Sequence, residues 1–476
     1  MSVSTSSTAT SPKEAASPSG VTVNGNHTTA AHAPAADDTN THTQPSTLEK
    51  GSTTAEAVPA TTTTTPNGIA IDPASFPDGG TRAWLTVLGC FCTMTITFGW
   101  IQSVGVFQAY YELNQLRAYS HSEVSWITSF TAFWLFAGGL VVGPLGDKHG
   151  PKALLIGGTL LHSFGLFMAS LATKYYQFIL SQGVCSAIGT SMLLYPSISC
   201  VVSWFYAKRA TAIGIAASGS GLGGVVFPLV VRQMLQTDHV GYPWTMRTIA
   251  FLVLLLGSIA CLTITSRLPP TPKMLTKDEI RKSLKDSLFV LVWITGPLAF
   301  LPQWLVLTFI VTTAYNDRHV DPNWAFYLVP ICNSASFFGR LIPGYLADRT
   351  GSITMYTYLM VYTFIVTAAL WIPVSGQAGM VVFAVLFGFG SGGLNALSPA
   401  VIAQISDVRT VGLRTGLIYA VTGVCCLFAS PAGGAIISHS GYRSMQGFAA
   451  AVMGVVALLT VYIRYRVGGM DLRKKI

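Results

Sequence analysis

Twelve long apolar runs follow one another from Ala83 to residue 466, and they constrain the fold more than any other feature of the chain. Each run holds roughly 20 to 27 residues, which is enough for a helix to cross about 30 Å of hydrocarbon. Only 10% of all residues are charged, against about 25% in an ordinary soluble domain. These values exclude a large water-soluble enzyme and predict an all-α integral membrane protein. The predicted membrane-spanning helices lie at residues 83–108, 124–145, 153–172, 177–204, 210–236, 245–266, 288–314, 324–346, 352–373, 377–404, 412–437 and 444–466.

The first 75 residues have a different composition. They are rich in Ser, Thr, Ala, Pro and Gly, and no aromatic residue precedes Phe76. Such a segment cannot bury enough apolar surface to offset the entropy lost on ordering. It also lacks an apolar core behind a basic start, so it does not match a cleavable signal peptide. We therefore expect residues 1–81 to form a disordered cytosolic tail, and residues 467–476 to form a second, short cytosolic tail.

Basic residues are distributed unevenly along the chain. Residues 1–81 carry seven acidic and two basic residues, which gives −5, and the remainder carries twelve acidic and 26 basic residues, which gives +14. Basic residues among apolar runs indicate a membrane protein with a cationic face, and not a protein that binds nucleic acid. Short loops rich in Lys and Arg stay on the cytosolic side. With a cytosolic N-terminus, 22 of the 28 basic residues face the cytosol, so we expect both termini there.

Two segments of the chain repeat each other. Residues 143–150 read G-P-L-G-D-K-H-G and follow the second run, and residues 344–351 read G-Y-L-A-D-R-T-G and follow the eighth run, 201 residues later. A repeat at this spacing indicates two parallel six-helix halves around a central site. The expected parts are a first six-helix bundle at 82–266, a polar cytosolic loop at 267–287 and a second six-helix bundle at 288–466.

The repeated element G-x-x-x-D-[KR]-x-G resembles the signature loop of the major facilitator superfamily. The resemblance covers roughly residues 78–466 and implies the fold of that family, in which two six-helix bundles expose a central site alternately to either side. Glycines let two helices approach closely, and a carboxylate can pair with a cation or a helix end in one of two states. The alternative without a functional role, a tight turn in a basic loop, is disfavoured because the element occurs twice. We expect gating roles for Asp147, Lys148, Lys152, Asp348 and Arg349.

Two further segments are similar to the monocarboxylate-porter family. Residues 77–84 read P-D-G-G-T-R-A-W and residues 204–214 read W-F-Y-A-K-R-A-T-A-I-G, and their form most resembles the fungal branch. The resemblance implies carriage of small organic anions, and the fungal branch also includes carriers of vitamins and secondary metabolites. Animal lactate carriers have a lysine and an aspartate, linked to proton and anion binding, where this chain has Gln102 and Ser336. Their arginine is retained as Arg340.

Arg340 is the strongest candidate for substrate binding, because it is a cation within an apolar run. Asn333, Ser336 and Arg340 recur at i, i+3 and i+7, which places them on one face of a helix. Such a polar stripe predicts the wall of a water-filled cavity. The alternative is that Arg340 extends to the cytosolic interface, and the sequence leaves both readings open. The other substrate-binding candidates are Gln102, Tyr195, Asn395 and Tyr419.

The sequence contains no motif for ATP binding, nucleophilic catalysis or metal coordination, so we expect neither an enzyme nor a cofactor. The runs hold no acidic residue deep in the membrane, and the single embedded His162 is more typical of a helix contact than of a proton relay. We predict a monomeric secondary transporter of a small organic solute, most readily a monocarboxylate or related anion, and leave proton co-transport open. The plasma membrane is the expected location and the vacuolar membrane the alternative. Alternative functions are export of a secondary metabolite, carriage of a vitamin-type (riboflavin-like) solute, and nutrient sensing without transport through the N-terminal tail.

Overall fold

The computed structural model describes residues 76–119, 121–237, 240–267, 277–406 and 410–469. All of these residues belong to one unit, Thr62–Ile476, and the described segments form only helices and their connections. Residues 1–75 and 470–476, where the sequence predicts most of the N-terminal tail and part of the C-terminal one, lie outside the described residues. Eleven helical segments among those described are long and apolar enough to cross a membrane.

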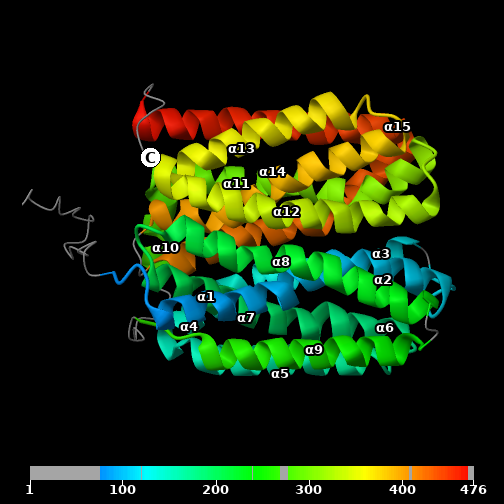
Figure 1. Cartoon of the computed structure of the whole chain (residues 1–476), viewed down its shortest axis with the longest axis horizontal. Coiled ribbons are helices and arrows are strands. Elements are labelled where there is room, and N and C mark those ends of the chain that lie inside the picture. Colours follow the sequence, from blue (N-terminus) through cyan, green and yellow to red (C-terminus); the bar gives the residue numbers. More distant parts are fainter. Residues whose placement is uncertain (1–75, 120, 238–239, 268–276, 407–409, 470–476) are drawn as a thin grey trace, which may run out of the picture. The chain divides into compact units, whose positions relative to one another are not determined.

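The first half of the chain supplies six of these crossings, several of them interrupted by a π-helical turn (Figure 1). A π turn leaves one backbone carbonyl without its usual helical partner, and such turns are frequent near functional sites. The second crossing is broken at Gly138, which separates two helices. The elements are α1 (Thr81–Met94), η2 (Thr95–Gly99), α2 (Trp100–Leu113), α3 (His121–Ala137), α4 (Gly139–His149), α5 (Pro151–Ala169), α6 (Tyr175–Phe178), η3 (Ile179–Ser186), α7 (Ala187–Trp204), α8 (Arg209–Arg232), η4 (Gln233–Thr237) and α9 (Tyr242–Thr263).

The second half supplies the remaining crossings. Its last helix, α15 (Val411–Gly468), runs for 58 residues, but Gly441 has φ 82° and ψ 172° and so divides it into two spans. Only glycine adopts this conformation without strain, and the division brings the number of crossings from eleven to twelve. The other elements are α11 (Ser287–Thr312), η5 (Thr313–Asp317), α12 (Pro322–Thr350), α13 (Ser352–Val366), η6 (Thr367–Trp371) and α14 (Gly376–Gln404).

A short helix, α10 (Lys277–Lys285), lies in the segment that the sequence predicts as a loop. Its residues are mostly charged, but Lys and Glu are good helix formers, and this propensity is invisible to a search for apolar runs. Asp286 then begins α11 by accepting hydrogen bonds from the N–H groups of Leu288 and Phe289, at 3.1 and 3.3 Å. The same carboxylate forms an ion pair with Arg414 of α15 at 3.1 Å. We call this end of the helices the α10 end.

The residues before α1 are held at the turn between α7 and α8. One carboxylate oxygen of Asp78 accepts hydrogen bonds from the backbone N–H groups of Tyr206, Ala207 and Lys208, at 2.7, 2.9 and 3.3 Å. Phe76 is buried, and its ring packs on that of Tyr206 with a centroid separation of 5.5 Å. This docking fixes where α8 begins.

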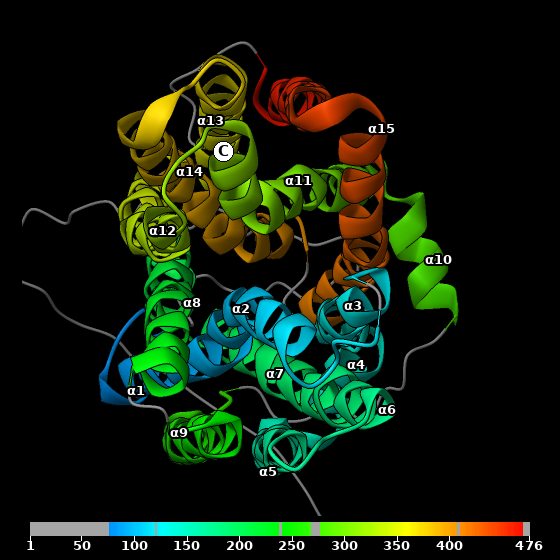
Figure 2. The same cartoon turned by 90° about the vertical axis from the view of Figure 1, so that its right-hand side faces the viewer.

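The two halves meet along two pairs of helices. Figure 2 shows α8 against α12 and α3 against α15. At the α10 end the contact involves the backbone itself, because a Cβ atom on Gly344 of α12 would lie 3.2 Å from the Cα atom of Gly214 in α8. Glycines at such positions let helices approach within backbone distance.

Candidate functional site

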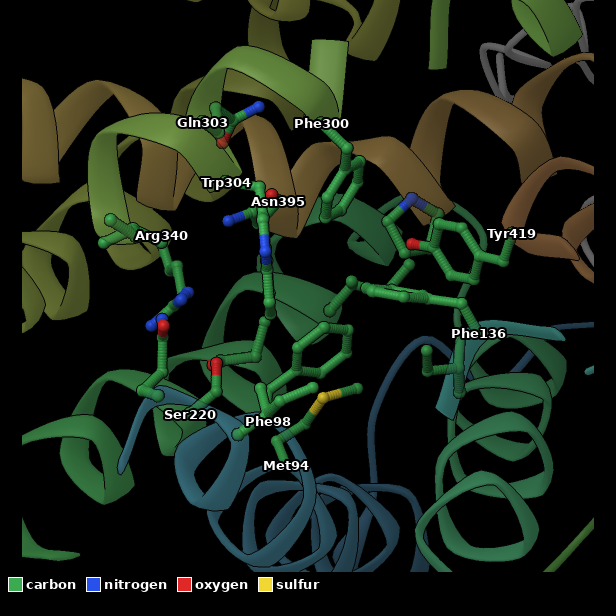
Figure 3. A pocket seen from close by; sticks show the side chains of 17 residues that line it. Met94, Phe98, Phe136, Ser220, Phe300, Gln303, Trp304, Arg340, Asn395 and Tyr419 are labelled. Atoms are coloured by element: carbon green, nitrogen blue, oxygen red, sulfur yellow. The ribbon is translucent and has the colours of Figure 1, made fainter. Parts of the chain in front are cut away.

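A pocket lies between the two halves, and helices of both halves contribute to its wall (Figure 3). The space not occupied by atoms amounts to about 690 Å³, counted up to and including its open side. Most of the wall is apolar. The lining residues are Met94, Phe98, Ile101, Gln102, Phe136, Ile198, Ile213, Ala217, Ser220, Phe300, Gln303, Trp304, Leu307, Arg340, Asn395, Pro399 and Tyr419.

Arg340 of α12 is the cation of this pocket. Its side chain is only 2% exposed, and its Nε and Nη1 atoms have no hydrogen-bond partner among the described residues. The space for the guanidinium exists because Gly221 of α8 has no side chain: a Cβ atom there would lie 2.7 Å from Nη1. A buried charge without a partner is costly, so the arrangement favours an anion that enters the pocket.

Gln102 and Asn333 connect the two halves beside the pocket. The Nε2 atom of Gln102 donates to Oδ1 of Asn333 at 3.1 Å. The Nδ2 atom of Asn333 donates to the carbonyl oxygens of Gly224 and Val329, at 3.3 and 3.1 Å. Gln102 therefore lines the pocket, while the hydrogen-bonding atoms of Asn333 are engaged with neighbouring groups.

Gln303 of α11 presents an unpaired acceptor. It is 3% exposed and lines the pocket. Its Nε2 atom lies 2.9 Å from the carbonyl oxygen of Ala299, and because a carbonyl can only accept, this end of the amide must be the NH2 group. Oε1 is thereby the other end, and it has no hydrogen-bond partner among the described residues. Asn395 of α14 likewise has an Oδ1 atom without a partner.

Three aromatic rings form the opposite side of the pocket, and we call them the aromatic wall: Phe136 of α3, Phe300 of α11 and Tyr419 of α15. Their ring centroids are 5.4 Å (Phe136–Phe300), 5.6 Å (Phe136–Tyr419) and 6.1 Å (Phe300–Tyr419) apart, all edge to face. Figure 3 shows Arg340 on one side of the pocket and the aromatic wall on the other. The site thus has a polar end and an aromatic, apolar end.

Asn333, whose amide is engaged as described above, and two further predicted candidates do not line this pocket. The hydroxyl group of Tyr195 donates to the backbone carbonyl of Phe136 at 2.6 Å, and its ring lies over Gly139, where α4 begins and no Cβ atom intervenes. Ser336 packs against Gly392 of α14. Both positions were expected to face a cavity, but small neighbouring residues bring other helices against these two side chains instead.

His162 also lies away from the pocket lining, inside the first half. Its Nδ1 atom is 2.8 Å from Oγ of Ser186 and its Nε2 atom is 3.0 Å from the carbonyl oxygen of Ile96. Since the carbonyl must accept, Nε2 carries the proton and Nδ1 accepts from the serine. The imidazole therefore joins the π-helical turns η2 and η3 to α5.

The predicted gating residues lie at the α10 end. The two carboxylate oxygens of Asp348 accept hydrogen bonds from the N–H groups of Ala210 and Thr211, at 2.9 and 2.8 Å, across the boundary between the halves. Asp348 thus binds the N-terminus of α8, where the helix dipole favours a negative charge. Arg349 donates to the hydroxyl group of Tyr345 and lies over its ring. Lys148 is half-buried and Lys152 is exposed, while the side chain of Asp147 lies outside the described residues.

Of the aromatic wall, only Tyr419 was among the residues predicted from the sequence; Phe136, Phe300 and Gln303 were not. Gln303 offered a signal, since it is the only Gln, Asn or charged residue in the predicted run 288–314. Burying an amide in an apolar helix costs free energy, as it does for the polar stripe in the eighth run. The two phenylalanine rings offered no signal, because the sequence does not distinguish a phenylalanine that faces lipid from one that faces a pocket.

The chain matches the Major Facilitator Superfamily over residues 83–380 and 359–469. It is 45% identical to MFS-type transporter 1 of Ophiocordyceps over 85% of this chain and 90% of that protein. It is 41% identical to the Fujikurins efflux protein of Gibberella fujikuroi (80% and 82%) and 38% identical to the Aspyridones efflux protein of Emericella nidulans (84% and 82%).

Solved structures share the fold at low sequence identity. The fucose transporter FucP in its outward conformation gives a TM-score of 0.62 at 13% identity, over 80% of this chain and 98% of that one. The human organic anion transporter MFSD10 gives 0.63 at 12% identity, with the same coverage. The chain belongs to the major facilitator superfamily: it is a multi-pass membrane transporter of small solutes and not an enzyme.

Proposed function

We propose that this protein exports a secondary metabolite that is an organic anion, and that the metabolite binds in the pocket beside Arg340. The observation that carries the proposal is the buried guanidinium with two unpartnered nitrogen atoms in a mostly apolar pocket. Two relatives at 38% and 41% identity are efflux proteins for fungal metabolites. Of the functions that the sequence left open, these relatives favour metabolite export over uptake of a simple monocarboxylate.

The anion chemistry agrees with the monocarboxylate-porter resemblance, which residues 77–84 and 204–214 support. A carboxylate or another delocalised oxygen anion can accept two parallel hydrogen bonds from a guanidinium, and charge-assisted bonds of this kind are roughly twice as strong as neutral ones. Hydrogen bonds from Arg340 therefore replace the hydrogen bonds to water that the anion loses on entering the pocket.

Movement of the anion requires the two halves to separate at one end and then at the other. Asp348 is placed to take part, since its hydrogen bonds to α8 exist only while the halves are together at the α10 end. We assign to it the gate at this end, and by the repeat the same role to Asp147.

The pocket wall offers no group that must bind a proton. Its seventeen described lining residues include no Asp, Glu or His. Transport of a permanently charged anion should therefore depend only weakly on a pH gradient, unless the solute carries its own proton.

Uptake into inside-out vesicles tests the proposed function. Vesicles with the full chain should accumulate aromatic organic anions such as 2-naphthoate faster than vesicles from cells without it, and lactate more slowly than 2-naphthoate. A chain that lacks residues 1–75 should retain this flux. Absence of flux for every anion would contradict a transporter, and a phenotype that requires the tail would then support the nutrient sensor.

Orientation forms a separate proposal: both termini and α10 face the cytosol, and the protein lies in the plasma membrane as a monomer. The 22-to-6 division of basic residues supports the orientation. An impermeant thiol or epitope label should reach a tag at residue 20, in the segment 268–276 or after Ile476 only in permeabilised cells, and a tag between Leu171 and Lys174 in intact cells. Labelling of the first three tags in intact cells would overturn the topology.

A further inference from the structure

The pocket presents hydrogen-bonding groups of opposite kinds. Arg340 can only donate, whereas Oε1 of Gln303 can only accept, and both side chains are almost completely buried. The polarity of the glutamine amide is fixed by its bond to the carbonyl oxygen of Ala299. A bare anion would satisfy the arginine and leave the glutamine oxygen without a partner.

We propose that the transported anion also carries a hydrogen-bond donor, an O–H or N–H group, which Gln303 accepts, and that both polar groups belong to a flat unsaturated body that packs on the aromatic wall. This inference rests on the proposed function, because it assumes that the pocket beside Arg340 is the substrate site. It makes Gln303 a specificity residue and narrows the substrate class from organic anions to aromatic or conjugated anions that bear a donor.

The requirement for a donor follows from the burial of the amide oxygen. In the structure this oxygen has almost no accessible surface and no partner among the described residues, so it is desolvated, and an unpaired buried acceptor costs free energy. A ligand without a donor leaves this free-energy loss in place, and sites with buried polar groups of this kind reject such analogues strongly. A ligand with a donor avoids that loss.

The requirement for a flat body follows from the rings. Phe136, Phe300 and Tyr419 are spaced for edge-to-face contact, and a planar unsaturated body can pack against their faces and edges in the same way. Phe136 belongs to the first half, and the other two rings belong to the second. A flat ligand at the wall therefore touches both halves at once, and a puckered ring of the same size fits this geometry less well.

Equilibrium binding to the purified full chain in lipid nanodiscs tests both parts. The probes are 2-naphthoate, its four derivatives with one hydroxyl group at ring position 5, 6, 7 or 8, and the saturated decalin-2-carboxylate. The four hydroxylated derivatives are isomers of one another. We expect at least one hydroxylated isomer to bind about 10-fold more tightly than 2-naphthoate, and decalin-2-carboxylate to bind about 10-fold more weakly. Gln303→Met should abolish the hydroxyl preference while 2-naphthoate still binds, which also shows that the variant folds. Phe300→Leu should reduce the preference for the flat ring.

Matched controls separate the effects. Gln404→Met makes the same change at an exposed position of α14, and Phe338→Leu does so on the exposed face of α12; neither should alter any preference. If no hydroxylated isomer gains affinity, or if the gain survives in Gln303→Met, the donor requirement is wrong. If decalin-2-carboxylate binds as well as 2-naphthoate, the flat-body requirement is wrong. Failure of the proposed function looks different, because 2-naphthoate would then bind equally well to the wild type and to Arg340→Ala.

Discussion

Arg340→Ala is expected to abolish transport of the anion and to weaken its binding by a factor of about 10 to 100. The estimate takes hydrogen bonds to a charged group as worth about 1.5–3 kcal/mol, with tenfold in affinity for each 1.4 kcal/mol. Arg340→Lys should retain part of the binding, since lysine keeps the charge but not the planar fork. Equilibrium binding and vesicle uptake of the same labelled anion measure the two effects.

A second substitution tests the position of the guanidinium rather than its presence. Gly221→Ala places a methyl group 2.7 Å from Nη1 and 3.0 Å from the Cα atom of Phe337, so it should displace both the guanidinium and α12 and impair anion binding while every charge remains. Gly434→Ala is the control, because a Cβ atom at this helical glycine meets nothing within 4 Å. Unchanged uptake in Arg340→Ala would contradict a role of this arginine in anion binding.

Asp348→Asn is expected to reduce flux by a factor of about 10 or more and to change the affinity for the anion by less than about 2-fold. Asparagine keeps one acceptor oxygen but loses the charge and points an NH2 group at a backbone N–H of α8. The closed arrangement at the α10 end is thereby destabilised relative to the open one, and the pocket itself is untouched. Initial rates of uptake and equilibrium binding should be measured on the same preparation.

Asp278→Asn serves as the control for the gate, since this aspartate is exposed on α10. It removes one negative charge near the same end of the protein without a contact to α8. Equal losses of flux and binding in Asp348→Asn, or normal flux, would contradict a role confined to the gate.

Much of the fold could be predicted because a membrane imposes its thickness on the sequence. The apolar runs give the crossings, and the superfamily and its fold are confirmed by the family match and by the solved structures. The exceptions have simple causes. Hydropathy does not detect α10, and it does not detect that the second crossing is divided at Gly138 into α3 and α4.

The site could be predicted only where a residue was out of place in its run. A cation such as Arg340 stands out, and the structure puts it in the pocket wall. Phe300 and Phe338 are alike in sequence, yet the first is 9% and the second 57% exposed, so only packing distinguishes a pocket ring from a lipid-facing one. Tyr195 and Ser336 were expected to face a cavity because of their hydroxyl groups, but the first donates to the backbone carbonyl of Phe136 and the second packs against Gly392.

The backbone at the start of α8 is hydrogen-bonded to two different carboxylates. Of the six backbone N–H groups from Tyr206 to Thr211, five are held by two carboxylates: three by Asp78 of the same half and two by Asp348 of the other. When the halves part at this end, only the two N–H groups bound to Asp348 must exchange that partner for water. The turn before the helix keeps its hydrogen bonds to Asp78. Formation of a first helical turn is the slow and unfavourable step in building a helix. The transporter therefore never has to rebuild this turn between cycles, and the closing carboxylate always returns to a preformed docking point.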